Sequence, residues 1–211
     1  MRIERSTGMG LRERKKLATR QALSVAALRL AVQRGLEHVR VEDIAAEAGV
    51  SPRTFNNYFS SKEEAIVSLG VDRAARIAAA LRDRPASEPL PDALSRAFVE
   101  QYGGDAEPDR EWVARLRVVI SSPALRGEYL KTLASTERLL AEAIAERTGT
   151  DVERDLFPRV LAAAASGAAR TALMYWLELG ATTTFAPVLQ QAIEQVVLGA
   201  PPPTADIGSS T

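Results

Sequence analysis

Apolar residues recur at helical spacing along most of the chain. Between residues 12 and 34, Leu17, Leu23, Ala27 and Leu30 approximate the 3.6-residue stripe of an amphipathic helix. No segment alternates apolar and polar residues like a strand, and the Asn-Gly and Asp-Gly pairs typical of hairpins are absent. The pattern predicts an all-α fold with helices near 12–34, 42–48, 52–58, 62–82, 90–102, 110–121, 124–147, 155–180 and 183–198.

A stretch with three prolines, Arg-Asp-Arg-Pro-Ala-Ser-Glu-Pro-Leu-Pro, interrupts the helical pattern at residues 82–91. We take it as the boundary region between two domains. The predicted organisation is a domain at 1–62 with a basic N-terminal arm, a connecting helix at 63–82, a second domain at 83–199 and a disordered tail at 200–211.

The second and third predicted helices are joined by Glu-Ala-Gly-Val-Ser, a helix-turn-helix pattern. Ser51 is a good N-cap, and Pro52 occupies the first helical position, where its missing N–H costs nothing. Val50 and Phe55 are spaced to form a hydrophobic staple across this cap. The third helix is therefore predicted from strictly local signals.

One face of this third helix is polar. Phe55 and Phe59 lie four positions apart and are predicted to face inward, which leaves Arg53, Asn56 and Asn57 on the opposite face. Arginine can bind guanine O6 and N7, and asparagine can bind adenine N6 and N7. The face is predicted to read bases in the major groove of DNA, and the alternative is an ordinary helical hairpin with a solvated face.

Charge is distributed unevenly along a chain whose formal net charge is zero. Residues 1–62 carry 12 Lys or Arg against 6 Asp or Glu, and residues 63–211 carry 15 against 21, so the balances are +6 and −6. This asymmetry favours a polyanionic partner for the first part. Basic residues placed to contact DNA phosphates or a minor groove are Arg12, Arg14, Lys15, Lys16 and Arg20.

Composition excludes several classes of site. Cysteine is absent, which excludes disulfides and thiolate metal sites. The basic N-terminal residues are not followed by the apolar run of a secretory signal, and the longest apolar stretches reach about half of the roughly 20 residues that a membrane span needs. We therefore expect a soluble, cytoplasmic protein without a membrane partner. No glycine-rich phosphate loop or metal-ligand cluster is found, so no cofactor, metal or catalytic residue is predicted.

The segment VEDIAAEAGVSPRTFNNYFSSKEEAI, residues 41–66, resembles the DNA-binding segment of the TetR family of transcriptional repressors. The variant RTFNNYFSSKEEA is also similar to a branch that includes mycofactocin-system regulators. Two departures from the family pattern matter: Val41 replaces a common threonine, and Asn56 replaces a frequent tyrosine, so the operators of better-known relatives do not carry over. By position, the resemblance implies DNA contacts for Arg40, Ser51, Arg53, Thr54, Asn56, Asn57, Tyr58 and, on a phosphate, Lys62.

The resemblance also implies that the second domain binds a small-molecule effector. Large side chains there are candidates to line a pocket, although packing in a core explains an aromatic residue equally well. An apolar or acyl-type effector, such as an acyl-CoA, is expected, and arginine suits its anionic end. The candidate residues are Phe98, Tyr102, Trp112, Met174, Tyr175 and Trp176, with Arg115, Arg117 and Arg170.

Residues 161–176 are rich in alanine and glycine, which allows close approach of helices. With residues 185–199, they match the position of the two family helices that form a four-helix dimer interface. A homodimer through the helices near 155–180 and 183–198 is therefore expected, on a palindromic operator in double-stranded DNA. The alternative for the alanine-rich segment is a tightly packed core helix.

The leading hypothesis is a ligand-responsive, DNA-binding repressor. A helical adaptor that binds protein is one alternative. An enzyme is the other, with little support, because His38 is the only histidine and no catalytic motif is found.

Overall fold

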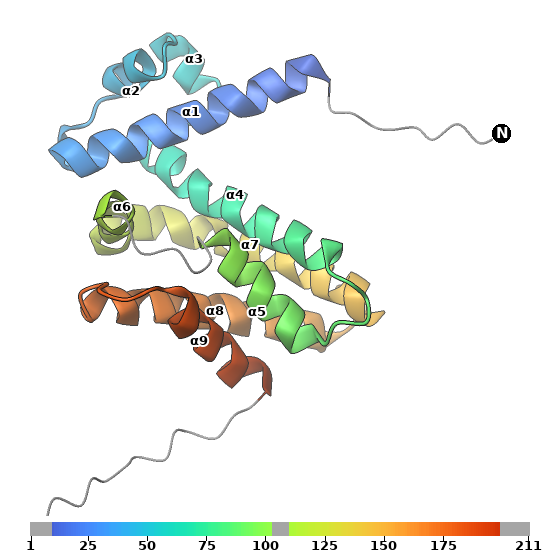
Figure 1. The fold of residues 1–211 in the computed structure, drawn as a ribbon. Coiled ribbons are helices and arrows are strands. Elements are labelled where there is room, and N and C mark those ends of the chain that lie inside the picture. The colour runs from blue at the N-terminus through green and yellow to red at the C-terminus, as the bar shows by residue number, and fades with distance from the viewer. Residues whose placement is uncertain (1–9, 103–109, 199–211) are drawn as a thin grey trace, which may run out of the picture. The chain divides into compact units, whose positions relative to one another are not determined.

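The computed structural model describes residues 10–102 and 110–198, which form helices and connecting turns without any strand (Figure 1). The all-α prediction is therefore confirmed. The predicted tail at 200–211 and residues 1–9 of the basic arm lie outside the described residues. The elements are α1 (Leu11–Arg34), the 3₁₀ turn η1 (Leu36–His38), α2 (Val41–Glu47), α3 (Pro52–Asn56), α4 (Lys62–Asp83), α5 (Leu90–Gln101), α6 (Arg110–Ser121), α7 (Pro123–Thr148), α8 (Leu156–Glu178) and α9 (Ala186–Leu198).

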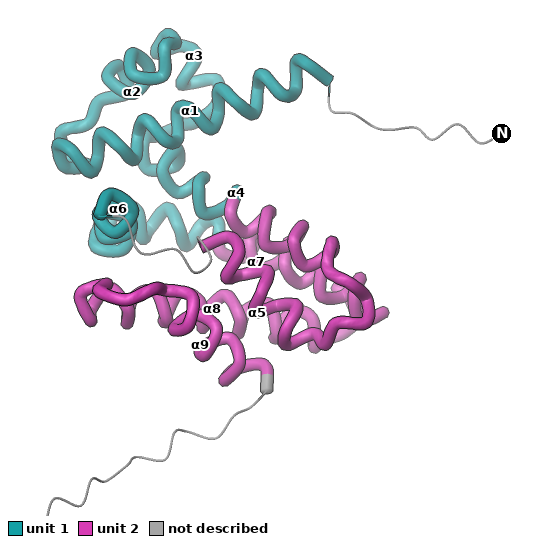
Figure 2. Tube along the Cα trace, in the orientation of Figure 1, with its two compact units in different colours: residues 1–72, 110–132 teal, residues 73–109, 133–211 magenta. Residues whose placement is uncertain are grey.

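The chain divides into two compact units, which Figure 2 colours separately. The first unit comprises residues 1–72 and 110–132, and the second comprises residues 73–109 and 133–211. Helices α4 and α7 each begin in the first unit and continue into the second, and α6 belongs to the first. This division differs from the boundaries that we placed at residues 62 and 82, which stay a prediction.

The core of the first unit is centred on the two phenylalanines of the helix-turn-helix. Phe55 of α3 and Phe59 just after it are buried, with ring centroids 5.7 Å apart. Leu17, which we placed on the apolar stripe of α1, is instead 46% exposed, because the fully buried positions of that helix begin only at Leu23. Other buried members of this core are Leu23, Ala27, Leu30, Ile44, Ala45, Ile66 and Leu125.

Paired polar groups hold α1 against the first part of α4. The hydroxyl groups of Ser24 and Ser68, both buried, lie 2.8 Å apart. One helical turn away, Arg20 donates to both carboxylate oxygens of Asp72, at 2.9 and 3.1 Å, and its guanidinium lies 5.2 Å from the centre of the Phe59 ring. Satisfied polar groups of this kind fix the position of one helix on another, because any shift would leave them unpaired.

The second unit packs α8 against α9 and α9 against α5 (orange, red and green in Figure 1). Its largest fully buried side chain is Trp176 of α8, and buried alanines on that helix leave room for close packing. Arg147 of α7 donates to the backbone carbonyls of Arg84, Pro85 and Glu88, at 3.2, 2.7 and 2.6 Å. These bonds order the proline-containing connection between α4 and α5.

Candidate nucleic-acid interface

Helix α3 begins as its sequence predicts. The Ser51 hydroxyl accepts a hydrogen bond from the backbone N–H of Thr54 at 3.1 Å, and Pro52 is the first helical residue. The Thr54 hydroxyl lies 2.9 Å from that of Ser51, so the two hydroxyl groups also pair with each other. The helix ends at Asn56, two residues earlier than predicted, and Asn57 and Tyr58 lie in the following turn. Local capping therefore determines where α3 starts.

The side chains proposed to read bases are exposed in the first unit. Arg53, Asn56 and Asn57 are all exposed, whereas Phe55 between them is completely buried. Tyr58 is half-buried and packs against the core. The short helix and the turn after it thus present three polar side chains above a buried apolar base, and their contacts with bases stay a prediction.

Lys62 has a structural role that the sequence did not indicate. Its ammonium group donates to the backbone carbonyls of Leu36, at 2.6 Å, and Val39, at 2.9 Å. These bonds join the start of α4 to the segment before α2 and use two of the three ammonium N–H groups. The predicted contact with a phosphate would have to come from the third.

The other residues predicted to contact DNA differ in their exposure and in their bonds within the protein. Arg40 is exposed just before α2, and its backbone N–H donates to Asp43 at 3.2 Å. Val41, where the family pattern commonly has threonine, is half-buried against the core, so its methyl groups have a packing role. Of the basic residues on α1, Arg12, Arg14, Lys15 and Lys16 are exposed. Arg20 is paired with Asp72, and its predicted contact with a phosphate stays a prediction.

The residues predicted to bind an effector are divided between the two units. Trp112 and Arg115 belong to α6 in the first unit, where Arg115 pairs with Glu111 at 2.5 Å, and Phe98, Tyr102, Met174 and Trp176 belong to the second unit.

Within the second unit, Phe98 and Trp176 are core residues, 3% and 1% exposed. The Trp176 indole donates to the Thr183 carbonyl at 2.9 Å and packs on Phe185, with ring centroids 5.3 Å apart. Met174 is on the outer surface of α8 and is 39% exposed. In this structure Phe98 and Trp176 therefore pack in the core, the alternative to lining a pocket.

A shallow recess of about 420 Å³ lies elsewhere in the second unit, at the C-terminal end of α7. Its lining includes the carboxylates of Glu142, Glu146 and Asp151, which would repel an anionic effector. None of the predicted effector-binding residues lines it.

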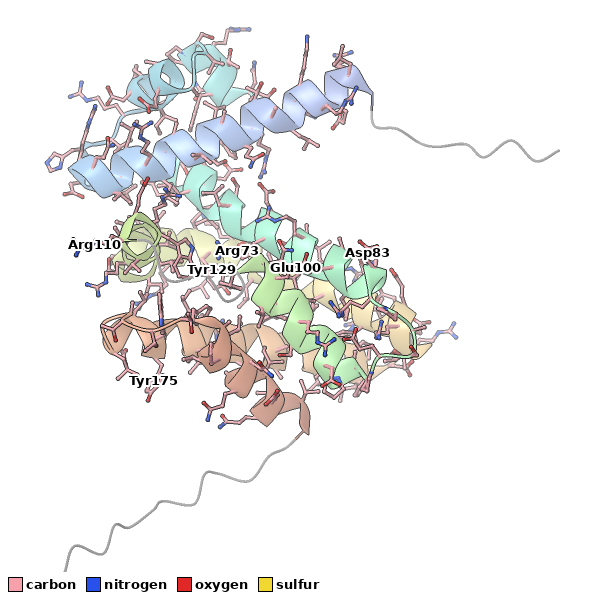
Figure 3. The ribbon with its side chains drawn as sticks, viewed as in Figure 1. Arg73, Asp83, Glu100, Arg110, Tyr129 and Tyr175 are labelled. Atoms are coloured by element: carbon pink, nitrogen blue, oxygen red, sulfur yellow. The ribbon has the colours of Figure 1, made fainter. Side chains whose placement is uncertain are left out.

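One apolar surface of the second unit stands out. Large apolar side chains on α8 are between 39 and 74% exposed, and Figure 3 shows Tyr175 projecting outward from this helix. We call this surface the α8 face; its members are Leu156, Phe157, Val160, Met174, Tyr175 and Leu179. Within the described residues, none of the helices is long and apolar enough to cross a membrane.

Two family models cover most of the chain. The model described as bacterial regulatory proteins, tetR family, matches residues 23–67, which include the helix-turn-helix. The model described as MftR C-terminal domain matches residues 88–201. The chain belongs to the TetR family. Members of this family are transcriptional regulators, which excludes the enzyme alternative, and the second match agrees with the resemblance to mycofactocin-system regulators.

Individual relatives of this TetR-family chain agree with the assignment. The HTH-type transcriptional regulator TcmR of Streptomyces glaucescens is 38% identical over 80% of this chain and 77% of its own. The mycofactocin biosynthesis regulator MftR of Mycobacterium tuberculosis is 27% identical over 78% of this chain and 82% of its own. The crystal structure of Thermus thermophilus FadR in complex with lauroyl-CoA has the same fold, with a TM-score of 0.59 and 20% identity over 90% of this chain and all of that one.

Arg73 is a residue that the sequence did not single out in this TetR-family chain. It occupies α4 beside other arginines, and only the packing distinguishes it: its side-chain Nε is buried and has no hydrogen-bond partner among the described residues (labelled in Figure 3).

Proposed function

We propose that this chain is a ligand-responsive repressor that binds a palindromic operator as a homodimer. The observation that carries the proposal is the exposure of Arg53, Asn56 and Asn57 on a capped helix whose other side is buried. In helix-turn-helix proteins, the second helix of the motif enters the major groove and its side chains contact base edges. A rigid base beneath α3 would keep these side chains in reading position.

Selection of bound fragments from a genomic library tests this part of the proposal. A repressor of this type should recover fragments that share a palindromic sequence, and gel-shift with one such fragment should show a single specific complex. Recovery of no enriched sequence, together with binding to a protein partner, would favour the adaptor alternative.

The α8 face supports the homodimer. Its large side chains, Leu156, Phe157 and Val160 at one end and Met174 and Tyr175 at the other, flank a central run of small residues that includes Gly167. If two copies of α8 crossed at Gly167 in antiparallel orientation, Val160 would meet Met174 of the partner subunit. Burial of this exposed apolar surface would then supply the association energy.

Charge substitution tests this arrangement in the full chain. Val160→Lys or Met174→Glu alone should yield monomers in analytical ultracentrifugation, because each buries an unpaired charge. The double variant should recover the dimer, since the two charges would then pair across the interface. Val25→Glu, at an exposed apolar position of α1, is the matched control and should leave the dimer intact. Dimers in both single variants would refute the crossing.

The effector is proposed to be an apolar or acyl-type molecule held by the second unit. Support comes from the match to the MftR C-terminal domain and from the fold shared with a FadR that binds lauroyl-CoA. An inducer binds better to the conformation that cannot fit the operator, and therefore lowers DNA affinity by population shift.

A thermal-shift series over acyl-CoAs and fatty acids, followed by operator titration, tests the effector class. An inducer must raise the melting temperature and also weaken operator binding. If no acyl compound does both, the acyl assignment is wrong and the DNA-binding part of the proposal stands.

A further inference from the structure

Arg73 carries a side-chain donor that no described residue uses. Its Nε is buried and unpartnered, and its half-buried guanidinium lies over the ring of Tyr102, with Cζ 4.5 Å from the ring centroid. A cation above an aromatic face is attracted to the ring, but that contact leaves the in-plane N–H groups unbonded. Buried donors in native proteins are nearly always paired, so this one requires an explanation.

Two acceptors next to Arg73 or to Tyr102 in the chain are already bonded to other arginines. Asp72, the preceding residue, accepts two hydrogen bonds from Arg20. Gln101, beside Tyr102, accepts a hydrogen bond from Nε of Arg76 at 3.0 Å. The guanidinium of Arg73 thus lies over a ring, and no described residue accepts a hydrogen bond from its buried Nε.

Two further aromatic side chains of the second unit lie beyond Tyr102. The Tyr102 ring packs edge-on against Phe185, with centroids 5.5 Å apart, and Phe185 packs against Trp176 at 5.3 Å. Phe185 and Trp176 are 2% and 1% exposed, so of these three rings only the half-buried Tyr102 offers surface, to which Arg73 adds a cation. This chemistry suits a molecule that has an oxoanion attached to an apolar body.

We propose that Arg73 binds the oxoanion, a carboxylate or a phosphate, of the effector, whose apolar body lies along the half-buried ring of Tyr102. The inference rests on the proposed function, in which the second unit holds the effector. A guanidinium can donate two parallel hydrogen bonds to the two oxygens of such a group, and the buried Nε would be one of these donors.

The test uses the full-length protein and three probes of equal chain length below their micelle concentrations: decanoate, decyl phosphate and decanol. Their dissociation constants are measured by calorimetry, with thermal shift as a second readout. For the wild type, we expect at least one of the two anions to bind tenfold or more tightly than the alcohol, and the preferred anion identifies carboxylate or phosphate. Arg73→Met should remove this preference, and Arg73→Lys should retain part of it.

Arg76→Met is the matched control, because Arg76 is an exposed arginine of the same helix whose Nε is already bonded to Gln101. It should keep the full anion preference. An unchanged preference in Arg73→Met, or no preference in the wild type, would overturn the inference. A purely structural role would lower the melting temperature of free Arg73→Met without changing the preference, and would overturn it as well. Gel-shift on the same samples reports separately on the proposed function.

Discussion

The two compact units differ in the groups that stand out in each of them. In the first unit, the polar groups beneath the surface are paired: Ser24 with Ser68, Arg20 with Asp72, and Lys62 with two carbonyls. In the second unit, large apolar side chains are exposed along α8, and the Nε of Arg73 is buried without a partner.

This difference indicates how each unit would bind. Base readout depends on a few hydrogen bonds of fixed direction, which need a rigid support that is satisfied within itself. A dimer interface and the apolar body of an effector depend on burying surface, which is non-directional, so apolar side chains can stay exposed until a partner covers them. The predictions below test this contrast.

The largest effect is expected from Phe55→Ala, which removes a completely buried ring from the core of the first unit. The free energy of unfolding should fall by about 3–5 kcal/mol. The chain has two tryptophans, Trp112 in the first unit and Trp176 in the second, so fluorescence in single-tryptophan variants reports on each unit. Urea unfolding should show the larger shift with the Trp112 reporter.

Each Phe55→Ala variant is compared with its own single-tryptophan background, Trp112→Phe or Trp176→Phe. Equal shifts with both reporters would mean that the two units unfold as one cooperative body, and the contrast between them would then not extend to stability.

Lys62→Met should lower the free energy of unfolding by about 1.5–3 kcal/mol, because it removes two hydrogen bonds from a charged donor and keeps the aliphatic stem. If the third N–H also contacts a phosphate, the slope of log affinity against log salt will flatten by roughly one per subunit. Lys16→Met is the control: Lys16 is exposed on α1, so its loss should flatten the salt dependence without lowering the free energy of unfolding. Unchanged stability in Lys62→Met would show that its two carbonyl bonds contribute nothing.

Asn56→Ala and Asn57→Ala should each reduce discrimination between operator sequences by about 1–3 kcal/mol if the amides bind bases through two hydrogen bonds. Both side chains are exposed, so unfolding should be unaffected. Competition between operator variants measures the loss, and Gln33→Ala on the exposed surface of α1 is the amide control. Wild-type preference in both asparagine variants would place α3 outside the groove.

The smallest effect concerns Glu64, which accepts hydrogen bonds from the backbone N–H and hydroxyl of Ser60, at 2.7 and 2.6 Å. The Ser60 hydroxyl holds the pKa of this carboxyl below its ordinary value, partly offset by burial. The carboxylate therefore stabilises the fold above its unfolded pKa, and the contribution is lost as the pH falls through the lowered folded pKa.

Glu64→Gln should cost about 0.5–1.5 kcal/mol at neutral pH. The stability difference from wild type should shrink at acidic pH, as the pH falls through the lowered pKa of the wild-type carboxyl. Chemical unfolding at several pH values measures this difference, and Glu63→Gln is the neighbouring control. If the stability difference between wild type and Glu64→Gln is the same at pH 7 and pH 3, the Glu64 carboxylate does not stabilise the fold in this way.

Structural elements that depend on residues close together in the chain could be predicted from the sequence alone. The start of α3 depends on Ser51, Pro52 and Thr54, which lie within four residues of one another, and the turn before it needs Gly49 at a φ of 68°. The alternation of Phe55 with Arg53, Asn56 and Asn57 likewise sets which side of a short helix is buried. Such interactions form wherever the segment is helical, so the exposure of the recognition side chains followed from the sequence.

The partners of the long charged side chains were decided only by tertiary packing. Lys62 bonds to carbonyls 23 and 26 residues away, and Arg20 bonds to a carboxylate 52 residues away. The sequence by itself specifies that a partly buried cation must find an acceptor, but flexible side chains reach several, and the fold determines which one is close. For the same reason, nothing in the sequence distinguished Arg73 from the other arginines of α4, since its unpaired nitrogen results from the neighbours that packing gives to Asp72, Gln101 and Tyr102.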